Sequence, residues 1–222
     1  MKPEIIIGVD LGGTRIKAVA IESTGKILHE HYQPTYDDDK KNWKEAVKNA
    51  VHTLYEKVGK SVLVIGISAP GLPNDDNSAI GFMPGRLHGL ENFIWSDFLE
   101  TKAFVLNDAV AAMMAEAKFG AAKNEKNVIM LTLGTGVGGG ILIDGKPYQG
   151  AFQKAGHLGH LTLDSDGEPD IIGTPGSLED AIGNCTIEKR TNGKFTSTDD
   201  LIAAHRNGDE FATKVWLTSV NK

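Results

Sequence analysis

The stretch Asp10-Leu11-Gly12-Gly13-Thr14 decides how this chain of 222 residues is expected to fold. It follows an apolar run, Ile5 to Val9, and precedes a second one, Ile16 to Ile21. An acid at a strand end, then a glycine pair, a hydroxyl and another strand predict a hairpin whose backbone N–H groups can hold a phosphate. Asp10 can in turn hold a magnesium ion beside that phosphate.

A second glycine loop lies far downstream, over Gly134-Thr135-Gly136-Val137-Gly138-Gly139-Gly140. Its glycine spacing matches the dinucleotide-binding fingerprint, but that fingerprint requires a helix immediately afterwards. Here Gly140 to Ile143 reads as a strand, so we expect a second phosphate hairpin instead. A glycine-rich hairpin without a ligand is the alternative. Two such hairpins predict one nucleotide held between two related α/β lobes with a cleft between them.

Composition excludes several classes of protein. Hydrophobic residues make up 41% of the chain, which is enough for a packed core, and the net charge is −6 with no basic cluster, so nucleic acid is not an expected partner. The single cysteine, Cys185, excludes an internal disulfide and a zinc site built from several thiolates. Neither a membrane-spanning run nor a signal peptide is recognisable, and we therefore expect a cytoplasmic protein without membrane contact.

Hydrophobic periodicity and turn residues predict the regular elements. Strands are expected over residues 5–9, 16–21, 26–31, 62–67, 104–106, 128–133, 140–143 and 161–163. Helices are expected over residues 43–58, 108–119, 176–182, 198–205 and 209–219, while residues 75–95 read as turn-rich. The first of these helices should stop at Gly59, and the run over residues 62–67 is typical of a buried parallel strand.

The pair Asn107-Asp108 stands where a strand is expected to end and a helix to begin, which is where open α/β sheets bind their ligands. One interpretation of Asp108 is a helix N-cap, a role that aspartate fills often. The other is catalytic, because phosphoryl transfer to an alcohol needs a carboxylate that accepts the hydroxyl proton.

Six motifs in order resemble the ROK (repressor, open reading frame, kinase) family of sugar kinases, which belongs to the actin/hexokinase/Hsp70 superfamily. They are Asp10 to Lys17, Ser68 to Gly71, Asn107 to Ala109, Leu133 to Gly140, Ala155 to His160 and Gly173 to Glu179. The resemblance implies a two-lobed actin-like (ribonuclease H-like) α/β ATPase fold, with mixed sheets flanked by helices and an interlobe cleft. The lobes would cover residues 1–110 and 111–222, the second of them incomplete at its C-terminus.

The resemblance also implies an activity and a set of site residues. The activity is ATP-dependent phosphorylation of a hexose or N-acetylhexosamine at its 6-hydroxyl, with Mg²⁺, by a homodimer or homotetramer. Asp108 would be the catalytic base. The sugar would be bound by Gly71, Asn92, Asn107, Asp108, His157, His160 and Glu179, and the nucleotide by Asp10, Gly12, Gly13, Thr14, Gly134, Thr135 and Gly136, with Asp10 at the magnesium.

The chain departs from the family pattern at three places. The zinc histidine is matched by His160, but the three zinc cysteines correspond to Asp170, Ile172 and Ser177, so we expect no zinc and a loop held by packing instead. His157 replaces a glutamate that accepts hydrogen bonds from sugar hydroxyls; an imidazole offers one acceptor and one donor, unless His157 is merely a loop residue.

The third departure is that the chain stops at Lys222, where family members usually continue. These three departures together favour the alternative function, a non-catalytic sugar sensor derived from a kinase. A third hypothesis, an actin-like nucleotide-binding module with a protein partner, fits the expected sugar residues less well. Because the first strand is expected to begin by residue 4, we do not expect the DNA-binding domain of the family's repressors.

Overall fold

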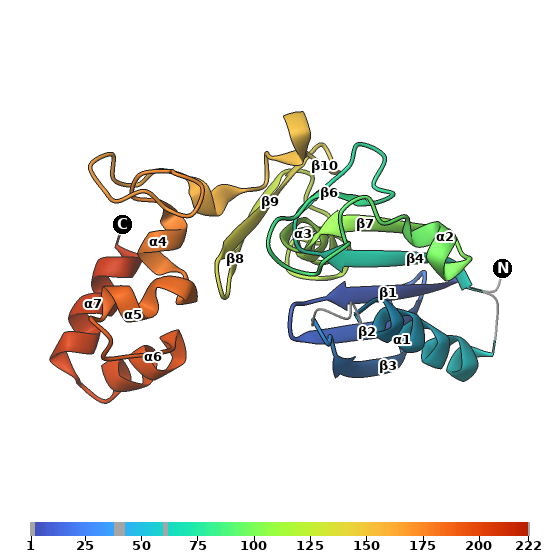
Figure 1. Ribbon diagram of the computed structural model, residues 1–222, viewed down its shortest axis with the longest axis horizontal. Helices are drawn as coiled ribbons and strands as arrows, with labels where there is room; N and C mark the ends of the chain where they lie inside the picture. Colours follow the sequence, from blue (N-terminus) through green and yellow to red (C-terminus); the bar gives the residue numbers. More distant parts are fainter. Residues whose placement is uncertain (1–2, 38–42, 60–61, 222) are drawn as a thin grey trace. The chain divides into compact units, whose positions relative to one another are not determined.

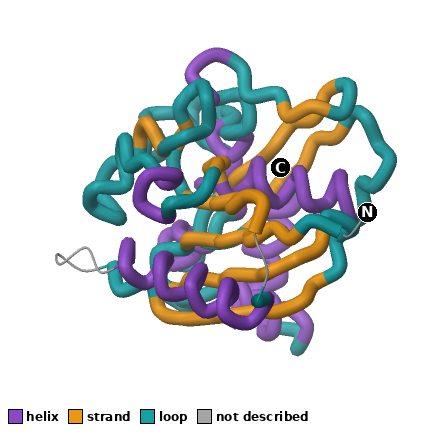
Figure 2. The backbone as a smooth tube through the Cα atoms, turned by 90° about the vertical axis from the view of Figure 1, so that its right-hand side faces the viewer, coloured by secondary structure: helices purple, strands orange, loops and turns teal. Residues whose placement is uncertain are grey.

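The computed structural model describes residues 3–37, 43–59 and 62–221, and divides into two compact units. The first unit comprises residues 1–124 and 149–154, and the second comprises residues 125–148 and 155–222. Residues 111–124 and 149–154, which the expected boundary assigns to the second lobe, lie in the first unit, where α3 (Asp108–Phe119) packs against strands β4 and β7. Strands and helices are mixed along the first unit, whereas in the second the strands come first and the helices follow (Figure 1, Figure 2).

The first unit is built on a five-stranded mixed sheet of order β3-β2-β1-β4-β7. Strands β1 to β3 form an antiparallel meander, whereas β1, β4 and β7 run parallel. The strands are β1 (Ile5–Leu11), β2 (Arg15–Glu22), β3 (Ile27–Pro34), β4 (Val62–Ala69) and β7 (Ala103–Asn107), and β5 (Leu72–Pro73) and β6 (Ile80–Phe82) form a separate ribbon. The helices are α1 (Trp43–Val58), α2 (Trp95–Leu99) and α3, with a 3₁₀ turn η1 (Ala151–Gln153).

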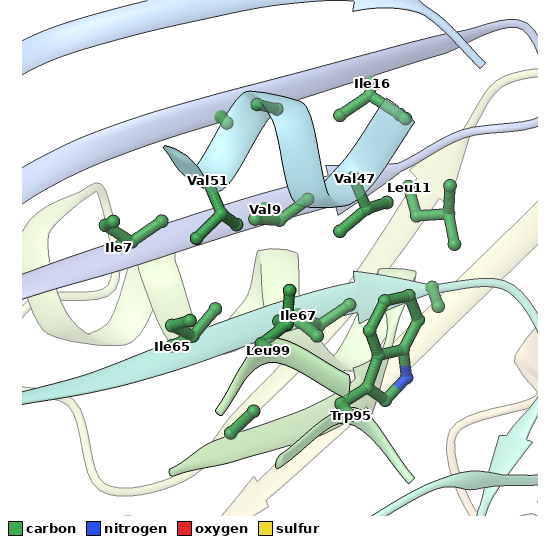
Figure 3. Close-up of a cluster of buried hydrophobic side chains, with 14 of the residues drawn as sticks. Ile7, Val9, Leu11, Ile16, Val47, Val51, Ile65, Ile67, Trp95 and Leu99 are labelled. Carbon is green, nitrogen blue, oxygen red and sulfur yellow. The ribbon is translucent and has the colours of Figure 1, made fainter. Parts of the chain in front are cut away.

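One apolar layer joins this sheet to α1 and α2. Alternate residues of β1, from Ile5 to Leu11, are buried, and α1 lies along β1, β2 and β3 (Figure 1). Figure 3 shows Val47 and Val51 of α1 directed toward the isoleucines and valines of β1 and β4, with Trp95 beside them. Because the side chains of a strand alternate between faces, this burial leaves Asp10 on the opposite face of the sheet.

The second unit holds a three-stranded antiparallel sheet of order β10-β9-β8 and a group of small helices. Its strands are β8 (Val128–Leu133), β9 (Val137–Ile143) and β10 (Lys146–Pro147). Its helices are η2 (Leu158–His160), α4 (Leu178–Ile182), η3 (Asn184–Thr186), α5 (Ile187–Arg190), α6 (Thr198–Arg206) and α7 (Glu210–Val220). A small core of Ile187, Leu201 and Ala212 joins the last three of them.

Most of the expected elements are present. The helix over residues 43–58 ends at Gly59, whose N–H donates to the Tyr55 carbonyl and whose φ is +55°. The expected strand over residues 161–163 is wrong, since only an isolated bridge between Thr162 and Ser177 forms there. The short helices α2 and α5 were not expected. No helix of the described residues is both long and apolar enough to pass through a membrane.

Candidate active site

The parallel strands of the first unit place several polar residues at one edge of the sheet. Asp10 of β1 pairs with Ser68 of β4, and Ala69 of β4 pairs with Asn107 of β7. The carboxyl ends of parallel strands meet at the same edge, so the phosphate hairpin and the Asn107-Asp108 pair share it. Strands β1 and β7 are two strand spacings apart, which is roughly 10 Å. The expected catalytic and phosphate-binding groups of this unit therefore lie along one edge.

Asp10 is oriented by its neighbours on the two flanking strands. The Ser68 hydroxyl donates a hydrogen bond to Asp10 Oδ1 (3.0 Å), and Lys17 Nζ lies 3.9 Å from Asp10 Oδ2. Both partners follow from strand register, because Lys17 and Ser68 are the residues paired with Asp10. The carboxylate keeps 46% of its surface exposed, so it can also contact a cation at the sheet edge.

The turn between β1 and β2 is held from behind by Thr35. Its hydroxyl donates to the Gly12 carbonyl (2.5 Å), its N–H donates to the Thr14 carbonyl (3.0 Å), and Thr35 itself is fully buried. Gly12 N–H donates to the Arg15 carbonyl across the turn. Within the described parts of the chain, no hydrogen bond uses the N–H groups of Gly13 and Thr14. These N–H groups fit the role of phosphate donors expected from the sequence.

Gly13 has a second neighbour that the motif alone does not indicate. A Cβ added at Gly13 would lie 1.5 Å from Nη2 and 2.7 Å from Cζ of Arg86. The guanidinium of Arg86 therefore occupies the space beside Gly13 in which any other residue would carry its side chain. Gly13 is absent from the residues with positive φ, and the contact is with the far end of a flexible side chain, so the structure shows a close approach without a strict need for glycine here.

Asn107, rather than Asp108, is the N-cap of α3. Its Oδ1 accepts from the N–H groups of Ala109 (3.0 Å) and Val110 (3.4 Å), and its Nδ2 donates to the Gly71 carbonyl (3.1 Å). The capping function that could have explained Asp108 is thus filled by its neighbour. Asp108 stands in the first turn with an exposed side chain, of which Oδ1 contacts the Ala109 N–H.

Gly71 and Asn92, the less specific members of the expected sugar site, lie in loops next to β6. Gly71 has φ +99°, and a Cβ there would lie 2.7 Å from the Phe82 carbonyl oxygen, so the position requires glycine. Asn92 is exposed and left-handed (φ +57°), and its N–H donates to the Ile80 carbonyl. Gly71 is joined to the edge through the Asn107 bond, whereas no hydrogen bond in the described residues links Asn92 to it.

In the second unit, Glu179 is tied to the glycine hairpin. Glu179 Oε2 accepts from the Val137 N–H (2.8 Å), and a Cβ added at Gly136 would lie 2.2 Å from the same oxygen. The hairpin is also joined to η3, because Asn184 N–H and Cys185 N–H donate to the carbonyls of Gly134 and Thr135. The expected nucleotide residues 134–136 and the expected sugar residue Glu179 are therefore adjacent.

His160 is paired with Asp170, one of the three positions where the family has a zinc cysteine. His160 Nδ1 lies 2.7 Å from Asp170 Oδ2, and Asp170 Oδ1 accepts from the N–H groups of Ile172 (3.0 Å) and Thr174 (2.9 Å). The Asp170 side chain has 0% exposed surface. Burial raises the pKa of its carboxyl, but the hydrogen bonds from His160, Thr174 and Ile172 outweigh this and lower the pKa to about 2.

The loop that follows His160 is held by hydrogen bonds, and our expectation that packing would hold it is wrong. Its apolar side chains face solvent: Ile171 is 89% exposed and Ile172 65%. The Leu163 N–H instead donates to the Gly176 carbonyl, and the Leu178 N–H donates to the Leu161 carbonyl. Across the described ranges, no group of three or more His, Cys, Asp or Glu residues is arranged to hold a metal ion. The absence of zinc stays a prediction.

His157 lies beside His160 at the start of η2. The two rings are nearly parallel, at 13°, with centroids 6.4 Å apart. Both are half-buried. The position that carries a glutamate in the family pattern is thus next to a residue expected to bind the sugar, which favours a ligand-facing function over that of an ordinary loop residue.

A hollow of about 540 Å³ in the second unit lies away from these residues. The loop over residues 163–177 and helices α4, α5 and α7 line it, and the wall includes Asp180, Lys189 and Arg190. Arg190 crosses from α5 to bind the Ser219 hydroxyl and the Gly183 carbonyl. None of the residues expected to bind sugar or nucleotide lines this hollow.

The structure thus gathers the expected residues into two groups. The first unit holds Asp10, Gly12, Gly13, Thr14, Gly71, Asn92, Asn107 and Asp108, and the second holds Gly134, Thr135, Gly136, His157, His160 and Glu179. Sequence reasoning missed Arg86, which stands in the stretch read as turn-rich, and the pairing of Asp170. The Pro84-Gly85-Arg86 turn was the available signal for the first of them.

The chain is similar in sequence and in fold to several known proteins. A sequence model described as the ROK family matches residues 6–222. The chain is 38% identical over 180 residues to a glucokinase of Streptomyces coelicolor, which covers 79% of this chain and 55% of that protein. A ROK hexokinase from Thermus thermophilus matches with a TM-score of 0.82 at 29% identity, over 97% of this chain and 73% of that chain.

A second solved structure adds ligands to the comparison. The ROK family glucokinase from Streptomyces griseus, in complex with glucose and AMPPNP, matches with a TM-score of 0.75 at 29% identity, over 97% of this chain and 75% of that chain. These matches confirm the α/β fold class expected from the motifs. The chain spans about half the length of the curated Streptomyces relative.

Proposed function

Because this chain belongs to the ROK family, we propose that it carries out ATP-dependent phosphorylation of a hexose or N-acetylhexosamine at the 6-hydroxyl. The similarity to glucokinases supports a sugar as acceptor and ATP as donor. The same family resemblance leads us to propose a cytoplasmic homodimer or homotetramer that uses Mg²⁺. The non-catalytic sugar sensor remains the alternative, and the assay below separates the two.

The main observation behind the proposal is that Asn107 and Asp108 have different roles. Asn107 caps α3 and bonds to Gly71, so Asp108 is not required as the cap. Its exposed carboxylate stands at the sheet edge that also bears the phosphate hairpin. A carboxylate in this position can accept the hydroxyl proton as the alcohol attacks the terminal phosphoryl group.

The other residues bind and orient. The N–H groups of Gly13 and Thr14 would hold phosphate oxygens, and Asp10 would hold the magnesium that neutralises them. Magnesium, when bound, supplies charge stabilisation for the transferred phosphoryl group. His160 would face the sugar with Nε2, because Nδ1 is used by Asp170, and Glu179 with Oε1, because Oε2 is used by Val137.

The decisive experiment replaces Asp108 with asparagine, which keeps the size of the side chain and removes its basicity. ADP release is measured with glucose, mannose, N-acetylglucosamine and N-acetylmannosamine. We expect Asp108→Asn to lower kcat by about 10²-fold or more. Asp97→Asn is the matched control, since Asp97 is also an exposed acid in the first turn of a helix of the same unit. Near-normal turnover by Asp108→Asn would exclude its role as base.

The same sugar panel tests the sensor alternative. If the chain is a sensor, one of these sugars raises its melting temperature, but the chain releases no ADP with any of them. A kinase shows both effects with the same sugar. The Asp108→Asn variant should retain the sugar-dependent rise in melting temperature, because the substitution removes a proton acceptor and leaves the sugar contacts of the second unit intact.

A further inference from the structure

We propose that Arg86 is a phosphate-binding residue of this site and contacts the phosphoryl group that is transferred. The inference rests on the proposed function for its reaction, and on the position of Arg86 for its chemistry. The guanidinium lies against Gly13, whose ideal Cβ would be 1.5 Å from Nη2, within the hairpin whose N–H groups fit a phosphate. A cation placed there adds positive charge beside the N–H groups of Gly13 and Thr14.

The backbone that directly follows Arg86 is anchored in the core. Leu87 and Leu90 are each 1% exposed and belong to the main core of the first unit. Leu90 N–H donates to the Leu87 carbonyl, and Leu87 N–H donates to Asp37 Oδ1. Leu87 also adopts a left-handed conformation, with φ +49°, which strains a leucine. The fold thus holds a strained, buried residue directly after an exposed arginine.

The surroundings of Arg86 favour an anionic ligand. Arg86 is exposed, and in the described part of the chain no carboxylate lies within ion-pair distance of it. Two further cations lie near the hairpin: Lys17 is directed toward Asp10, and Arg15 is exposed at the start of β2. The planar guanidinium of arginine can donate to two phosphate oxygens at once, whereas lysine acts only as a point charge. An arginine at this position therefore fits a phosphate better than a lysine would.

A surface arginine without a ligand is the alternative, and the contact with Gly13 argues against it. An arginine with no function at the hairpin would extend into solvent, where it keeps its rotamer freedom. Here it lies over a glycine whose φ does not require glycine. The guanidinium is thus directed at the hairpin backbone that is expected to bind a phosphate.

The first experiment measures phosphate binding without a sugar. The chain is titrated with Mg²⁺-tripolyphosphate, Mg²⁺-AMPPNP and adenosine, and the rise in melting temperature is recorded for the unaltered chain, Arg86→Gln and Arg86→Lys. We expect Arg86→Gln to need about tenfold more of either phosphate ligand for the same rise, with the adenosine response unchanged. Arg86→Lys should fall between the two. Arg206→Gln, an exposed arginine of α6, is the matched control.

The second experiment measures turnover with the best sugar of the panel. We expect Arg86→Gln to lower kcat by about 10²-fold, with the KM for the sugar unchanged within about twofold, since the lost contact is to the phosphoryl group. Far-ultraviolet circular dichroism and the urea midpoint establish that the variant folds. If Arg86→Gln does not fold, Arg86→Lys tests the role of Arg86 instead, because lysine keeps the positive charge and lacks the planar guanidinium.

The outcomes separate this inference from the proposed function. If no sugar is phosphorylated but Arg86→Gln still weakens binding of tripolyphosphate, the kinase proposal fails and the phosphate site stands. If the unaltered chain turns over sugar and Arg86→Gln matches it in both turnover and phosphate binding, Arg86 is a surface residue and the inference is overturned. Absence of any response of the unaltered chain to tripolyphosphate and AMPPNP also overturns it.

Discussion

Replacing Asp170 with asparagine should destabilise the second unit, and the size of the effect follows from three hydrogen bonds. The carboxylate accepts from His160 Nδ1 (2.7 Å), Ile172 N (3.0 Å) and Thr174 N (2.9 Å), with no exposed surface. Asparagine keeps one acceptor oxygen for the two backbone donors and presents its NH₂ group to His160. The lost charge-assisted bond corresponds to about 2 kcal/mol of unfolding free energy.

The measurement is urea unfolding followed by circular dichroism. At a slope of about 2 kcal/mol per M, the midpoint should fall by about 1 M. Asp166→Asn is the control, because Asp166 is an exposed acid in the same loop, and it should change stability by less than about 0.5 kcal/mol. Hydrogen exchange adds a local test, since Asp170→Ala should accelerate exchange at Ile172 N–H and Thr174 N–H, whereas Asp170→Asn should not. A midpoint for Asp170→Asn equal to that of the unaltered chain would refute this reasoning.

Three further predictions concern pH, the sugar site and the backbone. The pKa of Asp170 is lowered from 3.8 to about 2 in the folded chain, so its contribution to stability is complete above pH 3.8 and is lost as the pH falls toward 2; the difference in urea midpoint between the unaltered chain and Asp170→Asn should shrink over this range, and a constant difference would disprove it. Glu179→Gln should keep the Val137 bond and the unfolding free energy within about 0.5 kcal/mol, yet raise the KM for the sugar, because the amide retains one acceptor; an unchanged KM would remove Glu179 from the sugar site. Gly71→Ala should lower stability by about 1–3 kcal/mol, because φ is +99° and the new Cβ would lie 2.7 Å from the Phe82 carbonyl oxygen; calorimetry that shows no loss would contradict this.

The regular elements of the first unit could be predicted because local pattern and tertiary packing agree there. The apolar residues Ile5, Ile7 and Val9 alternate in the sequence, and the same residues are buried in β1. Val47 and Val51 stand at helical spacing, and both lie on the buried face of α1. In both cases one sequence period is enough to specify which side chains face the core.

The expected strand over residues 161–163 failed for the opposite reason. Leu161 and Leu163 are 53% and 40% exposed, so their apolar character reflects no buried face. Their backbone groups bind residues 176 and 178 across a loop, and only the fold brings these together. The short helix α5 was also missed, because four residues give too little periodicity to detect.

The sequence predicts the residues of the candidate site that belong to motifs, but not the contacts that other residues make with them. Residue type and position after a strand indicate the expected chemistry of the glycine pair at positions 12 and 13 and of the acid at position 108. Arg86 does not, because its relation to Gly13 joins residues that are distant in the chain and depends on the loop after β6. The pairing of His160 with Asp170 was likewise not predictable. The sequence shows that an aspartate replaces a cysteine at position 170, but not which side chain this aspartate contacts.

The contact between η3 and the glycine hairpin provides a natural position for a fluorescent label. Cys185 carries the chain's one thiol, it is exposed, and its N–H is bound to the Thr135 carbonyl. Burial and the charge of Glu179 raise the pKa of this thiol, so maleimide coupling will be slow at neutral pH and faster under alkaline conditions. A fluorophore attached there would need no prior cysteine removal, and under the proposed function its emission would report nucleotide binding at the adjoining turn in real time.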